Sequence, residues 1–134
     1  MNRTQQQRDR GAVAVEFALV VPLLIMVLVG IIEFANFFRI QMSVTQAARE
    51  AARSMAISND QTKAKAAGAL GAGASVDPSQ LGYGFSTPTC SQGSTMTVTV
   101  SYPLNSLAGG ALKSLTGAVL PSSVKGVSAM RCGG

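Results

Sequence analysis

The sequence contains no histidine and no tryptophan, and charged residues occupy only 13% of its 134 positions, about half of the share that is usual in globular proteins. Without histidine, the chain lacks the commonest general base and the commonest metal ligand. Its acidic residues are far apart in the sequence, and its serines have no evident activating base. The glycines of "GALGAGAS" also lack the preceding strand and the following Lys-Ser/Thr of a phosphate-binding loop. These absences predict that the protein is not an enzyme and has no cofactor.

Basic residues outnumber acidic ones by 11 to 6, which gives a net charge of +5. Three of them, Arg3, Arg8 and Arg10, lie within the first ten residues. The others are scattered and form no basic cluster interleaved with aromatic residues, as a nucleic-acid-binding surface would. The sequence therefore predicts no nucleic-acid partner. With this length, the chain forms at most one small domain and an appendage.

The longest apolar run reads "FALVVPLLIMVLVGII" from Phe17 to Ile32 and contains no polar side chain. With its flanking residues it extends over about residues 12–38, which is long enough to cross a bilayer as a helix. Membrane helices tolerate the Pro22 and Gly30 that it contains. A cleaved secretory signal has the same order of a basic and an apolar segment, but no A-x-A cleavage site follows the run directly. We therefore expect a retained single-pass membrane anchor.

The basic N-terminal segment predicts how this anchor is oriented. Short segments rich in arginine stay on the cytoplasmic side of the membrane. Although Arg39, Arg49 and Arg53 follow the apolar run, so short an N-terminal tail is easily retained in the cytoplasm. We therefore expect a cytoplasmic N-terminus and an extracytoplasmic C-terminal domain.

Beyond the membrane, residues 39–58 continue with helical spacing, since apolar residues recur at intervals of three and four and form one stripe. The stripe consists of Val44, Ala47, Ala48, Ala51, Ala52 and Met55. Its small residues let another helix or a sheet approach closely. The stripe covers the chain's own distal domain, neighbouring copies of the chain, or both.

Residues 59–134 form the predicted distal domain, whose composition changes along its length. Five glycines and one proline in residues 67–84 predict turns or a loop. Residues 94–103 alternate as a strand does. One face of this strand carries Met96, Val98, Val100 and Tyr102.

Two further segments of the distal domain are candidate strands, "SSVKGVSAMRC" and, more weakly, "LGYGFST". Between the strands, "LNSLAGGALKSLTGAVLP" is a candidate loop with a short helix. The sequence thus predicts an α+β fold. A long N-terminal helix, membrane-spanning and then amphipathic, precedes a small, mostly antiparallel β domain.

Cys90 and Cys132 are the only cysteines, and both lie in the part expected outside the cytoplasm, where disulfides persist. A disulfide between them would stabilise a domain with so small a core by about 4 kcal/mol. Two unpaired, buried thiols are the alternative. Without a histidine nearby, the pair is a poor metal site, and we expect no bound metal.

Residues 10–56 combine three motifs: R-G-x-x-x-x-E-F, then G-I-I-E-F after the apolar run, then A-A-R-E-A-A-R. This combination resembles the TadE-like family of pseudopilins from tight-adherence (Flp-type) pilus systems. The segments "TVTVSYPL" and "VSAMRC" resemble the family's distal strands only loosely. The resemblance implies a minor pilin or pseudopilin that acts in pilus assembly, adhesion or secretion, because major Flp pilins are usually shorter.

The resemblance also implies a processing site and an assembly site. A prepilin peptidase would remove a leader, residues 1–11, by cutting after Gly11, so that Ala12 becomes the first residue. Glu16 and Phe17 would then act in assembly, with Glu16 aligning each incoming subunit by pairing with a neighbour's free N-terminus. The implied partners are the membrane, other pilin or pseudopilin subunits, the prepilin peptidase and the inner-membrane assembly platform.

The position of Glu16 is informative without any family, because a carboxylate inside a membrane is costly and is retained when it has a partner. Cleavage would create that partner, an ammonium group at Ala12, one helical turn away. The expected parts are the leader, a helix over residues 12–58 and a domain over residues 59–134. A static, uncleaved single-pass anchor that displays a binding domain would need neither cleavage nor Glu16. A secreted soluble protein would require processing well beyond Gly30.

Overall fold

The computed structural model describes residues 3–105, 110, 114, 117 and 121–133, with side chains from residue 11 onward. The predicted loop and short helix of residues 104–121 therefore lie mostly outside the described residues. So do the arginine side chains of the predicted leader. The chain divides into two compact units, Met1–Ala35 and Asn36–Gly134, and each is described by itself.

The first unit consists of the N-terminal part of helix α1 (Arg3–Ser58). Its large apolar side chains are exposed, from 39% at Val29 to 75% at Leu19, except Val21, which is half-exposed. Because residues 23–29 are exposed in succession over two helical turns, the apolar surface runs all round the helix. Such a helix is typical of a membrane span or of the interior of a large protein.

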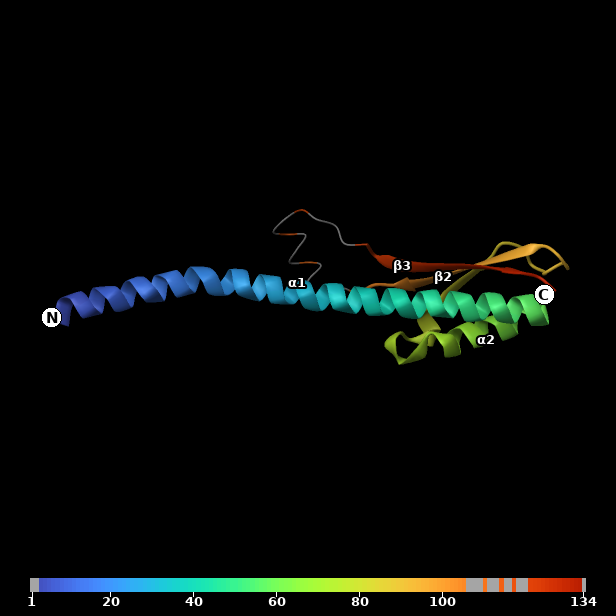
Figure 1. The fold of residues 1–134 in the computed structure, drawn as a ribbon, viewed down its shortest axis with the longest axis horizontal. Coiled ribbons are helices and arrows are strands. Elements are labelled where there is room, and N and C mark those ends of the chain that lie inside the picture. Colours follow the sequence, from blue (N-terminus) through green and yellow to red (C-terminus); the bar gives the residue numbers. More distant parts are fainter. Residues whose placement is uncertain (1–2, 106–109, 111–113, 115–116, 118–120, 134) are drawn as a thin grey trace. The chain divides into compact units, whose positions relative to one another are not determined.

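The second unit contains the rest of α1, a short helix and a three-stranded antiparallel sheet with the order β1-β2-β3 (Figure 1). These elements confirm the predicted α+β fold. After α1, the elements are α2 (Gln61–Gly71), η1 (Gly73–Ser75), η2 (Pro78–Gln80), β1 (Gly82–Phe85), β2 (Thr95–Pro103) and β3 (Ser123–Arg131).

All three predicted strands are present, and β2 agrees with its prediction most closely. Met96, Val98 and Val100 are fully buried, whereas the two threonines between them lie on the opposite face and are half-exposed. This is the inside–outside alternation of an antiparallel sheet with one covered face. The weakest candidate, "LGYGFST", forms β1, whose Tyr83 pairs with Val100.

The prediction of turns from residue 67 onward is wrong for its first part, because α2 continues to Gly71. The helix begins at a strong N-cap, since the carboxylate of Asp60 accepts hydrogen bonds from the backbone N–H groups of Thr62 and Lys63. Glycine disfavours a helix interior. At Gly68, however, an added Cβ would lie 2.8 Å from the ring of Tyr83 and 3.1 Å from the carbonyl oxygen of Ala47, so a larger residue would have to displace these neighbours.

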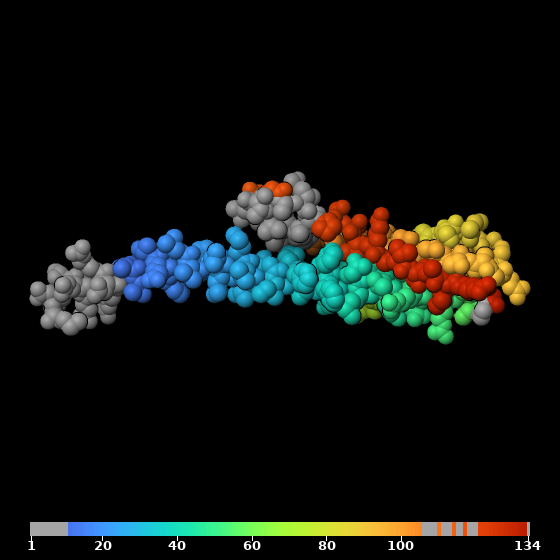
Figure 2. All heavy atoms as spheres, turned by 45° about the horizontal axis from the view of Figure 1, so that its top comes forward, coloured from blue at the N-terminus to red at the C-terminus, as the bar shows by residue number. Residues whose placement is uncertain are grey.

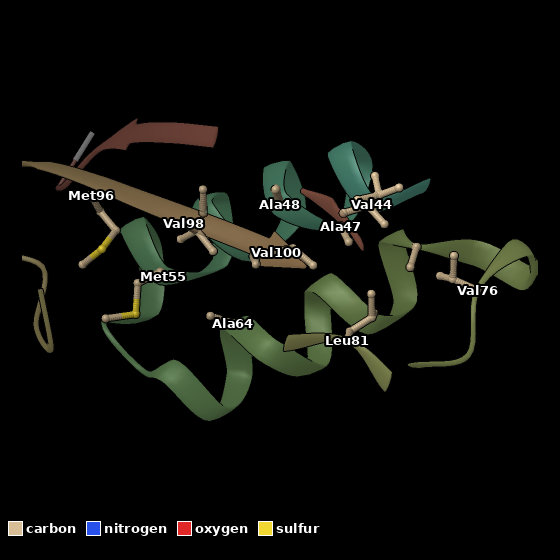
Figure 3. Close-up of a cluster of buried hydrophobic side chains, with 14 of the residues drawn as sticks. Val44, Ala47, Ala48, Met55, Ala64, Val76, Leu81, Met96, Val98 and Val100 are labelled. Atoms are coloured by element: carbon tan, nitrogen blue, oxygen red, sulfur yellow. The ribbon is translucent and has the colours of Figure 1, made fainter. Parts of the chain in front are cut away.

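The core of the second unit lies between α1 and the elements that cover it (Figure 3). The predicted α1 stripe is fully buried, with every member at 0% exposure. Figure 3 shows Ala47 and Ala48 of α1 near Val100 of β2. The prediction that the stripe covers the chain's own domain is therefore confirmed. Full burial leaves the same stripe no area for contact with neighbouring copies.

The contact between β3 and α1 depends on Gly126. A Cβ at this position would lie 2.6 Å from the carbonyl oxygen of Val44 and 2.8 Å from the backbone of Thr45. Because both neighbours are backbone atoms, neither can rotate away. The absence of a side chain at Gly126 is what allows the strand to lie directly on the helix.

Candidate processing and assembly site

The four residues of the predicted processing and assembly sites lie on α1 and are all exposed. Gly11 and Ala12 are helical, so the peptide bond expected to be cut lies inside α1 as the uncut chain folds. An added Cβ at Gly11 would meet no atom within 4 Å. The glycine therefore has no packing role in this chain. The small size of this residue can therefore serve recognition by another protein.

Glu16 lies one helical turn beyond Ala12, on the same side of α1, because residues four apart are neighbours on a helix. The side chains three and four positions away include Val13, 64% exposed, and Val20, 53% exposed. Phe17 follows, with 70% of its surface exposed. The carboxylate is thus placed within a surface that is otherwise apolar.

The segment that carries these residues is suited to a membrane. Within Gly11–Ser58, the described chain has one stretch long and apolar enough to cross a bilayer, and none of that stretch is buried. Complete exposure distinguishes it from the core helix of a soluble protein. A signal sequence near an N-terminus has the same length and composition.

The two cysteines are far from this site in the sequence, and they form a disulfide with a Cα–Cα distance of 5.6 Å. The predicted bridge is therefore present, and the alternative of two free thiols is wrong. Cys132 is nearly buried, at 2% exposure. Its backbone donates a hydrogen bond to the carbonyl oxygen of Ser94 and accepts one from Gly93.

Asn59 is a residue that the sequence analysis missed. It follows the last residue of α1 with a left-handed φ of 50°, and its side-chain oxygen accepts a hydrogen bond from the backbone N–H of Cys90. Asparagine directly after a helical segment is typical of a left-handed cap. The sequence therefore contained a signal for the cap at Asn59, but no signal for its contact with Cys90.

Two titratable groups of the second unit have shifted pKa values. The hydroxyl and the backbone N–H of Ser79 both donate hydrogen bonds to the carboxylate of Asp77 and lower its pKa. The side-chain amide of Gln80 donates a further hydrogen bond that also lowers this pKa. Burial raises the pKa of Tyr83. Within the part of the chain that the structure describes, no three acidic, cysteine or histidine residues are grouped so as to hold a metal ion.

Comparison with known proteins finds a family to which the segment that carries the site is similar. No curated protein and no solved structure shows a significant match to the chain. Residues 11–53 match the family model described as TadE-like protein. The match begins at Gly11, includes Glu16 and Phe17, and ends within the part of α1 that packs on the distal sheet. The resemblance predicted from the sequence is thereby confirmed over residues 11–53, which are similar to the TadE-like family.

Proposed function

We propose that the protein is a minor pilin or pseudopilin of a tight-adherence, type IV-like pilus. A prepilin peptidase cuts it after Gly11, and the shortened chain acts in pilus assembly, adhesion or secretion through packing of its apolar helix. One observation carries this proposal. A carboxylate stands in an exposed apolar helix one turn beyond the expected cut, inside the segment that matches the TadE-like family.

Cleavage gives the Glu16 carboxylate a partner that the uncut chain lacks. The new amine at Ala12 has an ordinary pKa of about 8, so it is mostly protonated at neutral pH. The two charges attract strongly in a medium of low dielectric constant. Within one chain they are a helical turn apart. Between chains, an unmatched Glu16 favours docking of a subunit that brings the ammonium group.

The proposed arrangement divides the chain into three parts. Residues 1–11 are the cytoplasmic leader, and residues 12–58 form the long helix, which spans the inner membrane over about residues 12–38. Residues 59–134 form the extracytoplasmic domain. The disulfide supports this orientation, because such bonds persist outside the cytoplasm. The proposal gives the protein no catalytic role, and its partners are other subunits, the peptidase and the assembly platform.

Intact-mass spectrometry of the membrane fraction tests the proposal. We expect a mature chain that begins at Ala12. As a matched variant, Gly11→Val should remain uncut, because the peptidase is expected to cut after a glycine. The substitution should leave the fold intact, since the space around Gly11 is open. Wild-type chains that still begin at Met1 would overturn the proposal in favour of a static single-pass anchor.

A further inference from the structure

The peptide bond between Gly11 and Ala12 lies inside helix α1, which begins at Arg3 (Figure 1). In an α-helix, each carbonyl oxygen accepts a hydrogen bond from the N–H group four residues further along the chain. The helical backbone therefore pairs the carbonyl oxygen of Gly11 with the N–H of Val15. It likewise pairs the N–H of Ala12 with the carbonyl oxygen of Arg8. Both polar groups of the bond expected to be cut are thus occupied while the helix is intact.

Hydrolysis of this bond needs access to both groups. The oxygen of a water molecule joins the carbonyl carbon of Gly11, the C–N bond breaks, and the two protons of the water pass to the nitrogen of Ala12. Gly11 then ends in a carboxylate, and Ala12 begins with an ammonium group. As the water adds, negative charge develops on the carbonyl oxygen, where an enzyme places hydrogen-bond donors of its own. The intact helix turns this oxygen toward Val15 in the next turn, away from such donors.

Little in the chain supports the helix at this bond. All side chains from residue 11 to residue 20 are exposed, and Figure 2 shows this segment, in blue, at the surface. The first turn of α1 contains no acidic residue and begins with Arg3, so it places positive charge at the positive end of the helix dipole. Gly11 weakens the helix further, because only proline is less favourable than glycine in a helix interior. A polar helix as short as the leader is only marginally stable in water.

The apolar part of α1 limits how far an opening can extend. Beyond Phe17 the helix is apolar and exposed, and in a membrane its backbone N–H and C=O groups could bond only to one another. Opening from the N-terminal end through Gly11 leaves unpaired only the next four N–H groups, as at the start of any helix. The helix can therefore open as far as the bond at low cost, and it is stable beyond it.

We infer that the helix over residues 3–11 opens before the peptidase cuts, and that the stability of this short helix sets the rate of cleavage. Proteolysis of a segment that opens and closes rapidly follows the population of its open form. Gly11 thus has a second role besides its small size, since it lowers the cost of opening at the bond itself. The inference rests on the proposed function, because it takes the bond after Gly11 to be the one that is cut.

Two triple variants with opposite effects on the helix test this inference. Gln5, Gln6 and Gln7 are all replaced by alanine in one variant and by glycine in the other. Both variants lose the same three side-chain amides and keep the arginines of the leader, but alanine favours a helix and glycine disfavours it. Cleavage of the full-length chain in nanodiscs by a purified prepilin peptidase, with the chain well below its saturating concentration, is followed by intact mass. We expect the glycine variant to be cut about tenfold faster than the alanine variant.

Amide hydrogen exchange supplies a readout that does not involve the peptidase. In the uncut chain, the backbone amides of residues 3–15 should exchange faster in the glycine variant than in the alanine variant, since exchange also follows opening. The matched control is the pair Gln46→Ala and Gln46→Gly, at an exposed position of the same helix within the distal unit. This pair makes the same kind of change far from the bond, so both variants should be cut at the wild-type rate.

Three outcomes would overturn the inference and leave the proposed function intact. One is equal cleavage of the two triple variants. Another is a difference in cleavage without a difference in exchange, which would mean that the peptidase reads the side chains themselves. The third is faster cleavage of Gln46→Gly to the same extent as of the leader variant, which would exclude an opening confined to the leader. A wild-type chain that is not cut after Gly11 would overturn the inference and the proposed function together.

Discussion

The side-chain oxygen of Asn59 accepts a 2.5 Å hydrogen bond from the backbone N–H of Cys90. Asn59 also ends α1, because its own N–H donates to the carbonyl of Met55 at 3.0 Å and its φ is 50°. Since Cys90 is bonded to Cys132, one asparagine connects the end of the long helix to the disulfide. The C-terminal residues also contact the last turn of α1, because the N–H of Gly133 donates to the carbonyl oxygen of Ala56.

Substitution of Asn59 should separate its two roles. Asn59→Gly keeps the left-handed backbone accessible but removes the acceptor for Cys90, which should cost about 1 kcal/mol. Asn59→Ala removes the acceptor and also strains the backbone, which should cost about 1 kcal/mol more. Thermal unfolding of the full chain in detergent measures both. Equal melting temperatures for the two variants would show that the left-handed conformation carries no cost here.

The disulfide should contribute more to stability than any single hydrogen bond of the distal unit. Its closure restricts the unfolded chain over a sequence separation of 42 residues, and loss of such a restriction should cost about 4 kcal/mol. Thermal unfolding with and without a reductant measures the effect. The control is the double variant Cys90→Ser, Cys132→Ser, which should be as unstable as the reduced protein and insensitive to reductant. A wild-type melting temperature unchanged by complete reduction would contradict this expectation.

Gly126→Ala should destabilise the distal unit by about 2 kcal/mol, because the new methyl group would overlap backbone atoms of α1. Gly84→Ala is the matched control in the same sheet. A Cβ there would find its nearest atom, the carbonyl oxygen of Thr99, at 3.8 Å, which is ordinary contact. The melting temperature of the control should stay near the wild-type value. Two variants of equal stability would show that β3 can move away from the helix without cost.

The sequence predicted the elements whose pattern is local. Alternation identified β2 because one of its faces is buried by α1 and the other is not. Helical spacing identified the buried stripe of α1, since alanine favours a helix and small side chains permit close packing. The disulfide was predicted from the expected extracytoplasmic location of both cysteines and from the small core of the domain.

What the sequence did not predict depends on contacts between distant segments. The later turns of α2 were missed because Gly68 and Gly71 weaken a helix, and only the positions of Tyr83 and Glu50 show how closely each glycine is packed. The link between Asn59 and Cys90 joins residues 31 apart in the sequence. At the proposed site, the motif led us to predict a role in assembly for Glu16, which stays a prediction. The structure adds that its surroundings are apolar and exposed.

The substitution Glu16→Ala decides whether the carboxylate acts in processing or in assembly. The peptidase is expected to act at Gly11, so the variant should still be cut and should show a mature mass that begins at Ala12. Without the carboxylate, an incoming subunit loses the charge that attracts its ammonium group. The amount of protein recovered in the sheared surface fraction should therefore fall, by about tenfold for the loss of roughly 1.4 kcal/mol.

The matched control for Glu16 is Val13→Ala, which shortens a neighbouring exposed side chain and leaves the charge in place. It should be cut and recovered at the surface like the wild-type protein. Glu16→Leu adds a second test, because leucine suits a membrane helix better than glutamate does. A chain that served only as an anchor would not need the carboxylate, so recovery of Glu16→Leu at the wild-type level would show that Glu16 has no role in assembly. Loss of recovery despite normal cleavage would mean that the carboxylate is retained for assembly, since membrane insertion alone gives no reason to keep it.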